Sequence, residues 1–147
     1  MSRFLLDINA LLALLDPMHI HHEDAHQWYE KTSPEQLMIC THVANGVMRV
    51  ASQPRYPNCL GTSGHVRKAL KKFVEHMEVE SCDKDASLMD DEVLKKPELL
   101  TPANITDLYL LAIAVANNAK LATFDKRIQP SAILGGKSAI EIIPSDI

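Results

Sequence analysis

Short apolar segments alternate along this chain with longer segments whose apolar residues have helical spacing. The strand candidates are residues 3–6, 37–41, 77–81, 120–124 and 139–143. The helix candidates between them are residues 8–15, 19–32, 43–51, 65–76, 85–96 and 107–117. Because strands that alternate with helices are joined by right-handed crossovers, the pattern predicts a three-layer α/β domain with a central, mostly parallel sheet of about five strands.

The length and composition indicate one domain over residues 1–147. A hydrophobic content of 46% in 147 residues is enough for a substantial core. Asp7 and Asp16 interrupt the apolar start, which we do not interpret as a signal peptide, and no apolar run approaches the ~20 residues that span a bilayer. Three widely spaced cysteines fit a reducing cytoplasm. The net charge of −4 does not by itself indicate a nucleic-acid partner.

Three aspartates occupy positions at which the predicted sheet would form a site. Asp7 follows the first strand, Asp125 follows the strand at 120–124, and Asp107 begins the most apolar helix. Each has an ordinary alternative, since an Asp near a helix start often caps it and an Asp after a strand often lies in a turn. Sites in parallel sheets form at the carboxyl ends of the strands, so we expect the three side chains to converge there.

Converging carboxylates repel one another and resist ionisation unless a cation is present. Carboxylate oxygens are ligands that suit Mg²⁺ or Mn²⁺. Such ions activate water and neutralise charge on a phosphodiester. The spacing therefore indicates metal-assisted phosphoryl chemistry as one possibility, without naming a substrate.

Several motifs resemble a known family in the order in which they occur. The opening FLLDINALLALLD, the central CTHVANGVMRVAS and the late ITDLYLLAIAVANNAKLATFDKRI are similar to VapC-type toxins of the PIN-domain ribonuclease family. The resemblance implies a PIN-like fold and a metal-dependent endoribonuclease, the toxin of a type II toxin–antitoxin system. It also implies an RNA substrate, an antitoxin partner and a homodimer, for which Val43 and Val47 would be exposed apolar candidates.

The resemblance also assigns roles to individual positions. Those that match the family's metal ligands are Asp7, Asp107 and Asp125, those that match its supporting polar residues are Asn9 and Thr123, and Arg49 matches an Arg that contacts substrate or pairs structurally. Position 44 departs from the pattern, because Ala44 stands where the family has Glu. We favour an engineered change that permits expression of a toxic protein over a natural, weakened relative, and expect low activity in either case.

Two alternative functions and two further clusters need separate consideration. Ala44 supports a catalytically inactive PIN domain that binds an antitoxin or regulates a partner, whereas a phospho-receiver domain is disfavoured because no place in it suits Asp107. His22 and His26 have the i, i+4 spacing of zinc ligands, but we expect them to be solvated or to cap a helix. The basic residues that would meet RNA, or only solvent, are Arg67, Lys68, Lys71, Lys72, Lys126 and Arg127.

Overall fold

A five-stranded parallel sheet forms the centre of the part of the chain that the computed structural model describes, residues 2–145. The strands lie in the order β3-β2-β1-β4-β5, and every neighbouring pair is parallel. Their bounds are β1 (Arg3–Leu6), β2 (Gln36–Ile39), β3 (Glu80–Ser81), β4 (Lys120–Thr123) and β5 (Ile140–Ile142). The central strands are apolar because both faces of the sheet are covered, and Leu5, Leu6 and Leu121 are all fully buried.

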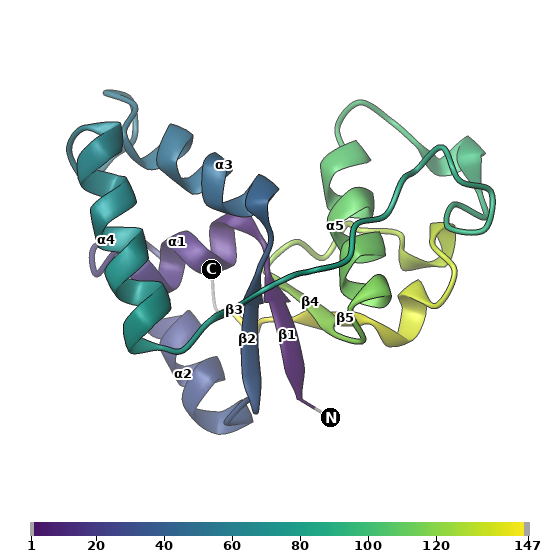
Figure 1. Ribbon diagram of the computed structural model, residues 1–147, viewed down its shortest axis with the longest axis horizontal. Helices are drawn as coiled ribbons and strands as arrows, with labels where there is room; N and C mark the ends of the chain where they lie inside the picture. Colours follow the sequence, from purple (N-terminus) through teal and green to yellow (C-terminus); the bar gives the residue numbers. More distant parts are fainter. Residues whose placement is uncertain (1, 146–147) are drawn as a thin grey trace.

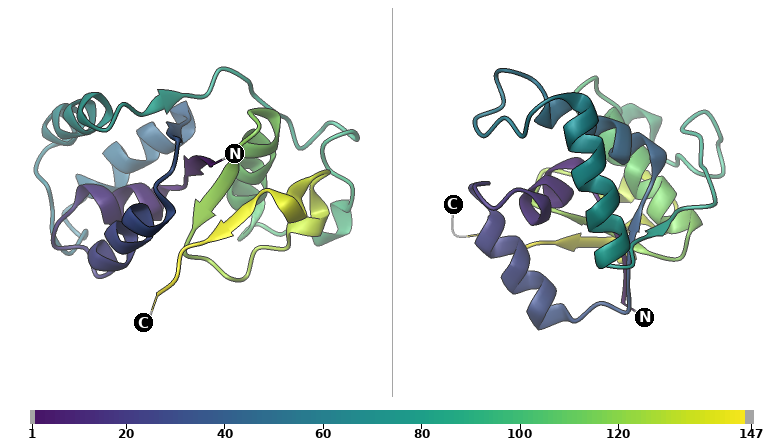
Figure 2. Two further views of the ribbon diagram at one scale, coloured as in Figure 1. Left: turned by 90° about the horizontal axis from the view of Figure 1, so that it is seen from below. Right: turned by 60° about the vertical axis from the view of Figure 1, so that its left-hand side comes forward.

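Helices cover both faces of the sheet. The α-helices are α1 (Ile8–Leu15), α2 (His22–Thr32), α3 (Thr41–Ala51), α4 (Ser63–His76) and α5 (Ile105–Ala116), and short 3₁₀ turns occupy Pro97–Leu99, Pro130–Ala132 and Gly136–Ser138. Helices α1 to α4 lie on one side of the sheet and α5 lies on the other (Figures 1 and 2). The predicted three-layer α/β architecture is thus confirmed. None of the helices in the described residues is long and apolar enough to cross a membrane.

The helix predicted at residues 85–96 is wrong, because this segment consists of turns. Its polar side chains bond to the backbone just ahead of them: Asp85 accepts the Ala86 N–H at 2.8 Å, and Asp90 accepts the Glu92 N–H at 2.8 Å. Such local bonds offer the backbone an alternative to the helical pattern. Leu94 then forms an isolated antiparallel bridge with Ile133.

Helix α3 packs closely on α1. Val43 and Val47 are fully buried, so the expectation that they form an exposed dimer surface is wrong. Gly46 lies against Ile8, and a Cβ atom at position 46 would be 2.5 Å from the Ile8 Cδ1 atom. The glycine therefore permits the close approach of α3 to the start of α1, directly beside Asp7.

Candidate metal-binding site at the carboxyl edge of the sheet

The pairing of β1 with β4 brings Asp7 to Thr123. Leu6 pairs with Ala122 in the parallel register, and Asp7 and Thr123 are the next residues. The Asp7 N–H donates to the Ala122 carbonyl at 3.3 Å, which extends the pairing to the carboxyl edge. The buried Thr123 hydroxyl donates to the Asp7 carboxylate and accepts the Asp125 N–H at 3.1 Å. Thr123 therefore connects the two aspartates that follow these strands.

Asp107 and Asp125 line one cavity of about 370 Å³, which we call the acidic cavity. Asp107 lies in the first turn of α5, and Asn104, the N-cap residue of that helix, lines the same cavity. A neighbouring cavity of about 400 Å³ shares Asp125 and includes Asn9 and Phe124; we call it the aromatic cavity. The structure thus brings Asp107 and Asp125 together and places Asn9 in the cavity next to them, which it shares with Asp125.

Asp7 is a buried carboxyl whose negative charge is poorly compensated. It is 7% exposed, and as the N-cap of α1 it accepts the Ala10 N–H at 2.7 Å. Burial raises the pKa of Asp7 to about 6, although hydrogen bonds from Thr123 and Ala10 lower it. The negative charges of Asp107 and Asp125 add to the increase. Asp7 therefore both caps the helix and interacts electrostatically with the other two aspartates.

Asp16 shows that a buried aspartate need not have a raised pKa. It is 1% exposed, and its carboxylate accepts hydrogen bonds from the Tyr56 hydroxyl at 2.7 Å, the Asn58 amide at 3.2 Å and the Met18 N–H at 2.9 Å. Burial acts to raise the pKa of Asp16, but these hydrogen bonds outweigh it and hold the pKa below its usual value. Asp16 anchors the loop between α3 and α4, whereas the charge of Asp7 would be stabilised by a cation.

Arg127 binds both carboxylate oxygens of Asp125. Its Nε lies 3.1 Å from Oδ1 and its Nη2 lies 3.2 Å from Oδ2. These bonds hold the pKa of Asp125 below its usual value, whereas burial and the charge of Asp125 raise the pKa of Asp107. From the sequence we expected Arg127 to contact RNA or solvent, and this ion pair was missed. The two-residue spacing between the acid and the base was the signal that could have indicated it.

The three aspartates do not form a ready-made coordination sphere. Among residues 2–145, no three His, Cys, Asp or Glu side chains are grouped closely enough to hold a metal ion. Asp125 is engaged by Arg127 instead. The donors are nevertheless carboxylate oxygens, and Mg²⁺ is often held by only one or two carboxylates together with water. The residues thus fit Mg²⁺ or Mn²⁺ in donor type, and their role as ligands stays a prediction.

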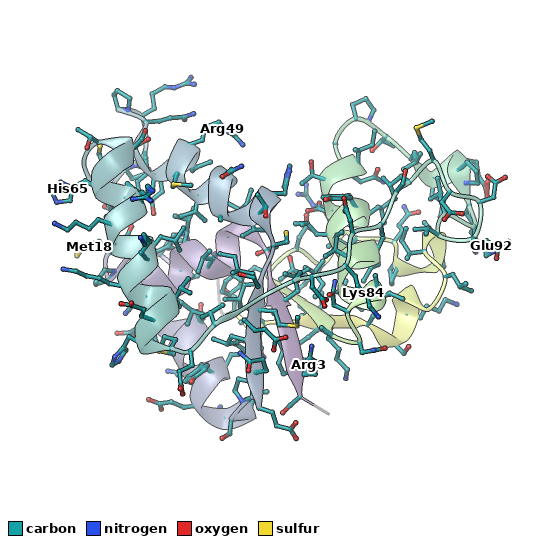
Figure 3. The ribbon with its side chains drawn as sticks, viewed as in Figure 1. Arg3, Met18, Arg49, His65, Lys84 and Glu92 are labelled. Carbon is teal, nitrogen blue, oxygen red and sulfur yellow. The ribbon has the colours of Figure 1, made fainter. Side chains whose placement is uncertain are left out.

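Ala44 and Arg49 lie outside both cavities. Ala44 lines a third cavity, between α3 and α4, together with Arg67 and Lys71; this interhelix cavity shares no residue with the other two. Arg49 is exposed, and Figure 3 shows it projecting from the surface of α3. The roles expected for these two positions therefore stay predictions.

Two of the clustered histidines cap the end of α1. The His22 Nδ1 lies 2.7 Å from the Ala13 carbonyl oxygen, and the His26 Nε2 lies 3.3 Å from that of Leu14. Carbonyl groups in the last turn of a helix lack partners within the helix, so both rings satisfy groups that would otherwise be unpaired. Of the two roles expected for this pair, solvation or capping, the structure shows capping.

Comparison with known proteins identifies the family. The sequence pattern of the PIN domain family matches residues 4–132. Ribonuclease VapC44 of Mycobacterium tuberculosis is 38% identical over 135 residues, which cover 90% of this chain and 93% of that protein. The chain belongs to the VapC-type PIN-domain family. The family resemblance inferred from the motifs is therefore confirmed, and a phospho-receiver domain is ruled out.

Further relatives support the assignment of this VapC-type PIN domain. Ribonuclease VapC38 of Mycobacterium tuberculosis is 30% identical over 142 residues, covering 95% of this chain and 96% of that protein. The crystal structure of VapBC2 from Rickettsia felis, bound to a DNA fragment from its promoter, matches with a TM-score of 0.54 and 16% sequence identity. It covers 85% of this chain and 89% of the matched chain, and at this identity it supports the fold alone.

Proposed function

We propose that this VapC-type PIN domain is a metal-dependent endoribonuclease and the toxin of a toxin–antitoxin pair. The observation that carries the proposal is the arrangement of Asp7, Asp107 and Asp125 at the carboxyl edge of the sheet, where Thr123 connects Asp7 to Asp125 and Asp125 shares a cavity with Asp107. Burial and neighbouring carboxylates raise the pKa values of Asp7 and Asp107, which marks a place where a cation is favoured. Relatives that cover nearly the whole chain are named ribonucleases, which points to RNA as the substrate.

The chain's own residues divide the work of such a site. Asp7, Asp107 and Asp125 would hold Mg²⁺ or Mn²⁺, which when bound activates water and neutralises charge on a phosphodiester. Thr123 orients the Asp7 carboxylate through its hydroxyl hydrogen bond. If Asp125 binds a metal cation instead of Arg127, the planar guanidinium group of Arg127 can donate hydrogen bonds to two oxygens of a phosphate.

A cleavage assay with single-stranded RNA tests the proposal. We expect slow endonucleolytic cleavage with Mn²⁺ or Mg²⁺, because Ala44 replaces the family's Glu, and no cleavage when EDTA removes the metal. Asp107→Asn should reduce the rate at least about tenfold, because it removes a charged oxygen ligand. Asp91→Asn, at an exposed acid outside both cavities, serves as the matched control and should cleave as the unchanged chain does. Equal rates with and without EDTA would contradict metal dependence.

The Ala44→Glu variant tests whether position 44 limits activity. We expect it to raise metal-dependent cleavage about tenfold or more, since a carboxylate at this position would restore the fourth acid of the family pattern. Arg67 and Lys71 line the same interhelix cavity and offer the introduced carboxylate a competing ion pair. Met48→Glu adds the same charge to that cavity one turn further along α3 and is the control. If both variants cleave at the rate of the unchanged chain, position 44 has no part in catalysis.

Ala44 also favours a second candidate function, a catalytically inactive PIN domain that binds an antitoxin or regulates a partner. Stable binding of an antitoxin protein, with no RNA cleavage by either the unchanged chain or Ala44→Glu, would support this candidate over the first. An antitoxin partner and a homodimer are part of both proposals. Neither can rest on Val43 or Val47, because both side chains are buried.

A further inference from the structure

The aromatic cavity adjoins the acidic cavity, since Asp125 and Arg127 line both. Its other residues include Asn9, His21 and Phe124. A chain-like ligand whose reacting group lies at the acidic cavity therefore has this second cavity beside it. The aromatic rings and the charges of its lining determine which part of such a ligand this cavity favours.

A stacked pair of rings forms one wall of the aromatic cavity. The His21 and Phe124 ring centroids are 4.5 Å apart, and the planes are inclined by only 20°. The His21 Nδ1 lies 3.1 Å from the Ser145 hydroxyl and 3.4 Å from the Asp24 carboxylate, which fixes the ring at the start of α2. Phe124 is fixed by the end of β4, next to Asp125. The pair is thus held in place on both sides, although its members are 103 positions apart in the sequence (124 − 21).

The same cavity has one positive charge, that of Lys126, that no acid among residues 2–145 neutralises. Lys126 and Arg127 are exposed and line it, and Lys126 has no ion-pair partner in the described part of the chain. The one acid in its lining, Asp125, is already paired with Arg127. The acidic cavity, by contrast, also contains Glu98 and Asp107. The two cavities therefore differ in kind: one favours a cation, and the other favours an aromatic ring attached to an anionic phosphate.

We propose that the aromatic cavity binds the nucleotide of single-stranded RNA that flanks the scissile phosphate, with its base against the His21–Phe124 pair and its phosphate near Lys126. Aromatic side chains stack on the bases of unpaired RNA without requiring a given sequence, and lysine contacts phosphate oxygens. The proposal rests on the proposed ribonuclease function and names a binding subsite for its substrate.

Binding in the absence of cleavage tests this subsite. The probe is a short single-stranded RNA that contains 2-aminopurine, titrated with the full chain in EDTA while fluorescence reports base stacking and affinity. His21→Ala and Phe124→Leu should each weaken binding by about tenfold and reduce the stacking signal. Phe124→Tyr, which keeps an aromatic face, should bind like the unchanged chain. His65→Ala is the control for loss of a histidine, because His65 lies on the outer side of α4, away from the cavity (Figure 3).

Salt dependence tests the phosphate contact separately. Lys126→Ala should reduce the slope of log affinity against log salt concentration by about 0.7, the value for one phosphate contact on a single strand. Lys31→Ala removes a lysine of equal charge from the exposed end of α2, outside both cavities, and should leave the slope unchanged. Thermal unfolding of every variant shows that the comparison is made on folded protein.

The outcomes separate this inference from the ribonuclease proposal. Unchanged affinity and unchanged stacking signal in folded His21→Ala and Phe124→Leu would overturn the subsite and assign the ring pair a purely structural role, even if the chain cleaves RNA. RNA binding that depends on His21 and Lys126, with no RNA cleavage by either the unchanged chain or Ala44→Glu in the presence of either metal, would support the subsite and contradict the nuclease proposal instead.

Discussion

Asp7→Asn is expected to reduce metal-dependent RNA cleavage by about 10²- to 10³-fold, the range seen when one group that stabilises transition-state charge is removed. The amide oxygen can still accept the Ala10 N–H and cap α1, so the fold should be kept. What is lost is the negative charge that a cation at the carboxyl edge would neutralise. Initial rates on a fluorescent single-stranded RNA measure the reduction in cleavage, and calorimetric titration with Mn²⁺ measures the loss of metal affinity.

Asp16→Asn is the matched control, since it makes the same change at the other buried aspartate of the N-terminal segment. The Asp16 carboxylate accepts hydrogen bonds from Tyr56, Asn58 and Met18, so its replacement should lower thermal stability. The rate per folded molecule and the Mn²⁺ affinity should stay as in the unchanged chain. Equal cleavage by Asp7→Asn and the unchanged chain would remove Asp7 from the site and with it the central support for the nuclease proposal.

The elements that could be predicted are those whose apolar residues have a clear period. Residues 3–6 form β1, and the spacing of Ile8, Leu11, Leu12 and Leu15 gives α1, as expected. The predicted helix at 107–117 is α5 (Ile105–Ala116), which lies on the opposite face of the sheet from the other four α-helices. The expectation that it is the most apolar helix is wrong, because α1 is more apolar. In each case the chain buries an apolar stripe or run, and burial sets the local structure.

The failures occur where local polar bonding or tertiary contacts decide the outcome. The segment at 85–96 has a weak helical pattern, and its Asp and Ser side chains bond to nearby N–H groups instead. The strand expected at 77–81 is reduced to Glu80–Ser81 at the edge of the sheet. Val43 and Val47 share the buried face of α3, but the expectation that they were exposed came from the family's dimers and not from the phase of the helix.

For the candidate site, too, some features could be predicted from the sequence and others could not. The rule that sites form at the carboxyl ends of parallel strands predicted that Asp7 and Asp125 would come near Asp107, and the electrostatic coupling of the three agrees with it. The bidentate Arg127–Asp125 pair and the His21–Phe124 stack depend on side-chain directions that no periodicity specifies. The sequence contained these residues but gave no sign of which would meet.

The raised pKa of Asp7 predicts that this residue's contribution to the stability of the metal-free protein falls as the pH rises. At pH values below the usual pKa of 3.8, the Asp7 carboxyl is protonated in both the folded and the unfolded chain, and its burial carries no electrostatic penalty. Between 3.8 and about 6 the unfolded chain gives up the proton while the folded chain retains it, so unfolding becomes more favourable. Above about pH 6 the penalty is complete, and a shift of this size corresponds to about 3 kcal/mol.

Urea unfolding of the unchanged chain and of Asp7→Asn, measured in EDTA from pH 4 to pH 8, isolates this contribution because the other titrating groups are common to both. We expect the free energy of unfolding of Asp7→Asn relative to the unchanged chain to increase by about 2 kcal/mol from pH 4 to pH 8, because the unfolded carboxyl is already partly ionised at pH 4. Mn²⁺ at pH 7.5 should reduce the difference in the free energy of unfolding between the two proteins. A bound cation stabilises the charged Asp7 carboxylate of the unchanged chain but not the neutral amide of Asp7→Asn. Parallel stability curves for the two proteins would mean that Asp7 ionises as an ordinary carboxyl, and the edge of the sheet would then have no particular affinity for a cation.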